Sequence, residues 1–207
     1  MIHRLLLLCG LILALWHLPA GAADRKPDLL HPGEILRGHF TQERQLAGFS
    51  RPLKSSGSFV LAPGQGLIWH TEAPLVDTTV ITANGILQLV NGQEAMRLSV
   101  TRLPVVGRFY DVLSGALTGD AGPLILAFKV ERQADAKQWQ LSLRAAREDD
   151  PALAQIVAIT VTGTQFVDTI EIQKPGGDAD RLSFSAQTKA SGSLSPEEAE
   201  LFQKSAR

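Results

Sequence analysis

The feature that most constrains this fold is the alternation of apolar and polar residues at every second position. The alternation runs through 138–145 and 181–187, where polar residues separate apolar ones such as Trp139 and Phe184, and through 124–131, where Lys129 and Glu131 alternate with Phe128 and Val130. Successive side chains of a β-strand point to opposite faces of its sheet. The pattern therefore predicts antiparallel strands, each with one apolar face and one hydrated face.

Short turn motifs separate the predicted strands. Asn84-Gly85 lies between the segments 78–83 and 86–90, and Asn and Gly tolerate the positive φ angles of a tight hairpin. Further turns are expected at Pro63–Gly66, Asn91-Gly92 and Lys174–Gly177. Further strands are expected at 37–44, 57–62, 67–71, 157–163 and 165–173. About ten strands without a strand–helix rhythm predict a mainly β fold, a large antiparallel sheet or barrel.

Few segments favour a helix. Residues 195–198 read Ser-Pro-Glu-Glu, with a Ser cap, Pro in the first turn and Glu three residues after the cap. This predicts a short C-terminal helix, with Leu201 and Phe202 available to dock it. The segment 105–117 has helically spaced apolar residues but also glycines, so it predicts a short amphipathic helix or a flap over the sheet. A weak turn is expected within 28–36.

The N-terminal segment predicts where the protein works. Residues 5–18 are mostly apolar, and Pro19 and the small residues 20–22 follow them. This pattern is typical of a cleaved secretory signal, and its apolar part is shorter than the roughly 20 residues that span a bilayer. We therefore expect a signal peptide over 1–22 and a single domain over 23–207, working in a bacterial periplasm.

Cysteine content and charge narrow the function classes. The only cysteine, Cys9, lies inside the expected signal, so the domain has no thiol for a disulfide, a metal or nucleophilic attack. Lipid attachment at Cys9 is an alternative, which the short apolar run before it disfavours. The net charge of −1 and the lack of a dense basic run argue against nucleic acid as a partner.

The chain carries no motif for catalysis or for a cofactor. His31, His39 and His70 lack the spacing of metal ligands, and neither a Gly-x-Ser-x-Gly elbow nor a phosphate-binding glycine loop is present. His39 and His70 are expected on the polar faces of strands. The acidic pairs within 149–150 and 178–180 are expected in solvated turns. We predict no enzyme activity, no metal and no cofactor; a lipid or glycan hydrolase with dispersed site residues stays an alternative.

Five short motifs follow one another in the first half of the chain. They are Phe40-x-Gln42, Gly57-x-Phe59, the strand ending at Trp69, Glu72-x-Pro74 and the Asn84-Gly85 turn. This run, from Phe40 to Gln93, resembles the LolA family, periplasmic carriers that take lipoproteins to the outer membrane. The Arg-Pro-Leu segment at 51–53 is most similar to a divergent LolA-like branch.

The resemblance implies a LolA/LolB-like unclosed antiparallel β-barrel with a short helical lid and a hydrophobic cavity for acyl chains. Apolar strand faces with few helices to cover them favour such an interior independently. The candidate cavity residues are Phe40, Phe59, Leu61, Leu67, Trp69, Ile81, Leu126, Phe128, Trp139, Leu141 and Phe184. The candidate lid residues are Val106, Phe109, Tyr110 and Leu113.

The sequence departs from the principal carrier at the position implied to latch the lid. In that carrier an arginine precedes the proline before the tryptophan strand, whereas here Ala62 precedes Pro63. Alanine cannot make the hydrogen bonds of an arginine, so the lid must be controlled differently or held more weakly. Pro32 and Gly33 also shorten the expected N-terminal helix. The resemblance to divergent LolA-like proteins therefore implies a lipoprotein or another acylated or polyene-type lipid as the cargo.

These observations predict a monomeric periplasmic carrier that binds acyl chains and moves them toward the outer membrane. Its expected partners are the acyl lipid or lipoprotein, an inner-membrane exporter and an outer-membrane acceptor, with no anchoring in a membrane. Arg44 and Arg51 flank an apolar loop and are candidates to meet a lipid headgroup or a partner. The main alternative is an accessory binding module of an envelope lipid-export complex.

Overall fold

The computed structural model describes residues 28–101, 114–115, 122–125, 128–146, 153–154 and 156–206. Several expectations lie outside these ranges and stay predictions. They are the signal peptide over 1–22, the acidic pair at 149–150, Leu126, and the lid residues Val106, Phe109, Tyr110 and Leu113. No helix in the described part of the chain is long and apolar enough to cross a bilayer.

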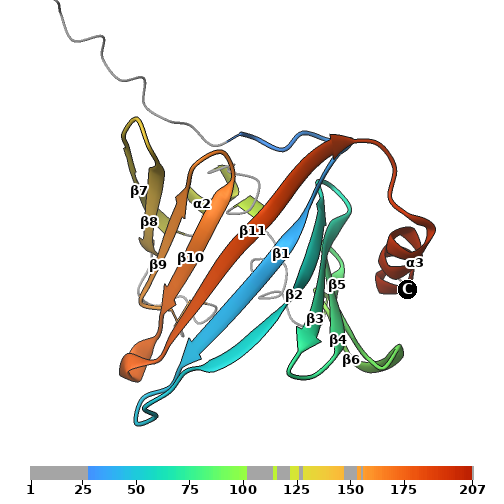
Figure 1. Ribbon diagram of the computed structural model, residues 1–207, viewed down its shortest axis with the longest axis horizontal. Helices are drawn as coiled ribbons and strands as arrows, with labels where there is room; N and C mark the ends of the chain where they lie inside the picture. Colours follow the sequence, from blue (N-terminus) through green and yellow to red (C-terminus); the bar gives the residue numbers. More distant parts are fainter. Residues whose placement is uncertain are drawn as a thin grey trace, which may run out of the picture.

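One antiparallel sheet of 11 strands forms the molecule, in the order β6-β5-β4-β3-β2-β1-β11-β10-β9-β8-β7. The sheet is twisted and curved, with β2–β6 on one side and β7–β10 on the other (Figure 1). Its strands are β1 Glu34–Gln45, β2 Leu53–Ala62, β3 Gly66–Ala73, β4 Asp77–Thr82, β5 Gly85–Val90, β6 Gln93–Ser99, β7 Phe128–Ala134, β8 Trp139–Ala145, β9 Ala158–Gly163, β10 Val167–Gln173 and β11 Ala179–Ser191.

The two longest strands, β1 and β11, pair along the middle of the sheet. Their register runs from Glu34 opposite Ser191 to Gln45 opposite Ala179, with a bulge near Arg37. Because β1 also pairs with β2, the first and last strands of the chain are neighbours in space (Figure 1). This pairing joins the two halves of the sheet.

Apolar side chains pack on both faces of the sheet. The larger group, here called the inner cluster, includes Leu36, Phe40, Phe59 and Trp139, and its strand residues come from β1–β4 and β7–β11. The smaller group, the outer cluster, lies on the opposite face of β2–β5, where α3 (Pro196–Ser205) covers it. In β3, Leu67 belongs to the inner cluster and its neighbour Ile68 to the outer cluster. Part of the sheet is therefore buried on both faces.

Most of the local predictions are confirmed. The Asn84-Gly85 turn joins β4 to β5. The turn expected at Lys174–Gly177 contains the short 3-10 helix η1, Pro175–Gly177. Ser195 caps α3 in a capping box with Glu198. The weak turn expected within 28–36 is limited to residues 32–33, and β1 begins directly after it.

The strand predicted over 124–131 is wrong in its first half. The short helix α2, Gly122–Ile125, precedes β7, which begins only at Phe128. Leu124 is fully buried in the inner cluster, whereas Ile125 is largely exposed. Alternation over so few residues does not separate a strand from a helical turn, and proline in a first turn favours the helix.

Candidate functional site

Four aromatic rings meet on the inner face of the sheet. Strand register places Phe40 opposite Phe184 and Phe59 opposite Trp69. The Phe40 and Trp69 ring centroids are 3.7 Å apart in a stacked arrangement, and Phe184 packs at nearly right angles to both Phe59 and Trp69. Aromatic pairs of this kind add about 0.5–1.5 kcal/mol beyond burial. β1, β2, β3 and β11 thus share one rigid apolar surface.

A glycine brings the aromatic rings close to the central strands. A Cβ atom at Gly38 would lie 2.8 Å from Cε1 of Phe59 and 3.1 Å from Cγ of Gln187. The absence of a side chain at Gly38 therefore lets the Phe59 ring lie against the backbone of β1. Gln187 donates from its Nε2 to the Val167 carbonyl at 2.8 Å, which ties β11 to β10 on the same face.

The structure brings together every candidate cavity residue that it describes. Trp69 is half-buried against the inner cluster, and the others are buried within it. Trp139 is fully buried, and its Nε1–H donates to the Thr164 carbonyl at 3.0 Å. The buried members are Phe40, Phe59, Leu61, Leu67, Ile81, Phe128, Trp139, Leu141 and Phe184. A cavity among these side chains remains a prediction.

Several buried members of the inner cluster are not among the candidate cavity residues. These residues come mainly from β8–β10, α2 and the segments around them: Leu124, Leu143, Leu153, Ile159, Val161, Val167 and Ile170. In β9 the alternation of Ile159 and Val161 with threonines was a usable signal. No local pattern indicates Leu153, which is buried although it lies outside the strands.

A charged cluster lies at the end of the inner face where β1 ends and β11 begins. It consists of Gln42, Arg44, Lys174 and Asp180 and is called the Asp180 cluster below. Asp180 accepts hydrogen bonds from Arg44 Nε at 2.7 Å and from Lys174 Nζ, with Gln42 Nε2 3.5 Å away. Burial alone raises the pKa of the Asp180 carboxyl, but the hydrogen bonds from Lys174 and Arg44 outweigh it and hold that pKa below its usual range.

The Asp180 cluster corrects the expectation of solvated acidic turns. Asp180 lies within β11 and is buried, because the register places it opposite Arg44. Asp178 lies just before β11, and its Oδ1 accepts the Ala47 backbone N–H at 2.7 Å. Both carboxylates therefore hold the β1–β2 and β10–β11 connections together. Arg44 and Ala47 could not be predicted as their partners from the sequence, because they lie more than a hundred residues away along the chain.

The histidines lie as expected and do not gather. His39 is exposed on β1, and His70 Nδ1 lies 2.9 Å from Thr78 Oγ1 on the neighbouring strand. Among the residues that the structure describes, no group of three or more His, Cys, Asp or Glu side chains is placed to hold a metal ion.

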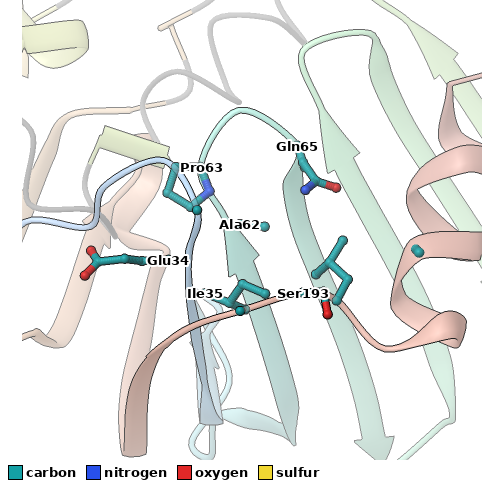
Figure 2. Close-up of a pocket in the computed structure, with 10 residues that line it drawn as sticks. Glu34, Ile35, Ala62, Pro63, Gln65 and Ser193 are labelled. Carbon is teal, nitrogen blue, oxygen red and sulfur yellow. The ribbon is translucent and has the colours of Figure 1, made fainter.

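A separate pocket of about 290 Å³ opens on the outer side (Figure 2). It lies between the start of β1, the β2–β3 turn and the segment that joins β11 to α3, with walls that include Ile35, Ala62 and Gln65. Ala62 is buried in the outer cluster. Close by, the Arg37 guanidinium makes a bidentate ion pair with Glu198 of α3, at 2.9 and 2.6 Å. The residue at the implied latch position therefore packs beneath the C-terminal segment.

The sheet is open, it curves around an aromatic inner face, and β1 and β11 form its centre. These features define the class of unclosed, barrel-like antiparallel sheets. Sequence comparison identifies the family. A model described as outer membrane lipoprotein carrier protein LolA-like matches residues 28–203, and the chain belongs to this LolA-like family. No curated protein sequence matches the chain.

Solved structures match the chain at low sequence identity. The LolA superfamily protein NE2245 from Nitrosomonas europaea is 8% identical, with a TM-score of 0.43 over 82% of this chain and 91% of that one. A Pseudomonas aeruginosa MucA/MucB complex matches at 10% identity and a TM-score of 0.46, over 79% of this chain and 54% of that one. LprF from Mycobacterium bovis matches at 10% identity and a TM-score of 0.38, over 79% and 88%.

Proposed function

We propose that this protein is a periplasmic carrier that binds the acyl chains of a lipoprotein or another lipid on its inner face and moves them toward the outer membrane. The observation that carries the proposal is the continuous apolar inner cluster, centred on stacked Phe40 and Trp69. Membership of the LolA-like family supports it. Removing an acyl chain from water stabilises a complex by about 0.8 kcal/mol per CH₂ group. A 16-carbon chain thus gains on the order of 10 kcal/mol before the entropy costs of binding.

Native mass spectrometry of the protein purified from cells tests this function. We expect a population whose mass exceeds that of the chain by an acyl lipid. Trp69→Glu should abolish this population, because a charge beside the Phe40 ring disfavours an apolar ligand. His39→Gln is the matched control, since His39 is exposed on a strand of the same sheet. Wild-type protein that never carries lipid, even after incubation with it, would contradict the carrier function.

One observation favours the alternative of a docking module. β6 is the last strand on its side of the sheet, and residues 93–97 on it are exposed. An unpaired strand edge is a template for another chain to add a strand. A docking module would co-purify with a membrane partner and without lipid. Ala95→Pro on β6 should release that partner and leave any lipid binding unchanged.

A further inference from the structure

The Asp180 cluster contains one more positive charge than negative charges. Two cations, Arg44 and Lys174, meet the single carboxylate of Asp180, which leaves a net charge of +1. Asp178, the nearest other carboxylate along the chain, accepts the Ala47 backbone N–H. Among the described residues, neither cation makes an ion pair with Asp178. The excess charge is therefore not balanced within the cluster.

Arg44 keeps its terminal nitrogens for another group. Its Nε donates to Asp180, while its two Nη atoms bond to no atom of the described residues. The Arg44 side chain is 48% exposed and that of Lys174 is 30%, whereas Asp180 is only 7% exposed. The buried carboxylate thus holds both cations in place and leaves their outer N–H groups facing solvent. A guanidinium with free Nη groups suits bidentate recognition of a carboxylate or phosphate.

The Asp180 cluster lies on the same face as the aromatic rings. Every second residue at this end of β1 points to the inner face: Phe40, Gln42 and Arg44. Their partners on β11 are Phe184, Leu182 and Asp180. Arg44 lies four residues after Phe40 along the strand, a distance of roughly 14 Å at about 3.4 Å per residue. The inner face therefore passes from stacked rings to a cationic end along one strand.

Resting on the carrier function proposed above, we propose that the Asp180 cluster binds the anionic headgroup, a carboxylate or a phosphate, of the acyl lipid whose tail lies on the inner face. Arg44 and Lys174 contact the headgroup, and Asp180 positions both cations. The tail then runs from Arg44 along the inner face toward Phe40 and Trp69. The cargo class that follows is an acidic amphiphile rather than a neutral acyl lipid.

Isothermal titration calorimetry with three probes tests this site. Laurate and 1-monolauroylglycerol share a 12-carbon tail and differ in headgroup charge, and inorganic phosphate supplies an anion without a tail. We expect laurate to bind the wild type roughly tenfold more tightly than the neutral lipid, because charge-assisted hydrogen bonds add to the same burial. Arg44→Gln should weaken laurate binding about tenfold and monolauroylglycerol binding less than twofold. Lys174→Gln should act in the same direction.

Arg181→Gln is the control, since Arg181 follows Asp180 on β11, so its side chain points to the opposite face, where it is exposed and pairs with Glu171. It should leave the affinity for both lipids unchanged. Equal losses for laurate and the neutral lipid in Arg44→Gln would show a structural role and overturn the headgroup site. A wild type that binds both lipids alike would overturn it too, while leaving the carrier function standing. Phosphate binding as tight as laurate would identify a free-anion site instead, and binding of neither lipid would overturn the carrier function itself.

Discussion

Gly57 shows how one residue is fixed by the approach of two strands. A Cβ atom there would lie 1.9 Å from the His70 carbonyl oxygen and 3.0 Å from the Thr71 Cα. β2 and β3 change register beside Gly57, so the two backbones come closer at this point than a side chain permits. The Gly-x-Phe pattern therefore has a physical reason. Gly57 lets the backbone of β3 lie close to β2, and Phe59 packs on the inner face.

Gly57→Ala should destabilise the protein by about 1–3 kcal/mol, the usual cost of forcing atoms into a packed site. The free energy of unfolding from urea titrations measures this loss. Ser58→Ala, at the next position on the outer face of β2, is the control and should change the free energy by no more than about 0.5 kcal/mol. An unchanged midpoint for Gly57→Ala would mean that β3 is not held this close to β2.

At the scale of elements, α3 begins where its sequence predicts. The Ser195 hydroxyl accepts the Glu198 N–H at 3.1 Å, and Glu198 Oε2 accepts the Ser195 N–H at 2.7 Å. Glu198 also binds the Arg37 guanidinium, and the hydrogen bond from Arg37 holds the pKa of Glu198 below its usual range. The helix cap is therefore joined directly to β1.

Ser195→Ala should lower the free energy of unfolding by about 1 kcal/mol, the usual value of an N-cap hydroxyl. Urea titration measures the total loss, and amide hydrogen exchange should show faster exchange at the start of α3. Gln203→Ala serves as the comparison, because Gln203 is exposed on the same helix. If both variants unfold at the same urea concentration, the capping box does not stabilise α3 in solution.

At the scale of the whole molecule, part of the sheet is buried on two faces because α3 covers its outer face. Phe202 is 7% exposed and packs with Ile68, Val80 and Leu87 of the outer cluster. Arg97 on β6 donates to the Lys204 carbonyl at the end of the same helix, at 3.1 Å. A helix of ten residues thus covers the side of the sheet that faces away from the aromatic rings.

Phe202→Ala should cost about 3–5 kcal/mol of unfolding free energy, as for other buried phenylalanines. Phe49→Ala makes the same chemical change at a side chain that is 62% exposed, and should change stability by about 0.5 kcal/mol or less. Differential scanning calorimetry of both variants gives the comparison. Equal melting temperatures for the two would contradict the docking of α3 on the outer cluster.

The sequence by itself determined most of the strands, the hairpin at Asn84-Gly85, the cap at Ser195 and half of the buried inner cluster, because alternation, turn residues and caps act over a few residues. It predicted neither β6 nor α2, because a short run such as 124–131 satisfies both the strand and the helix pattern and no clear alternation marks β6. Only the tertiary structure decided that Arg44 and Asp180 are partners and that Ile68 and Val80 are covered. These contacts join residues more than a hundred positions apart, and they follow from the register of β1 against β11 and the docking of α3, which no local pattern specifies.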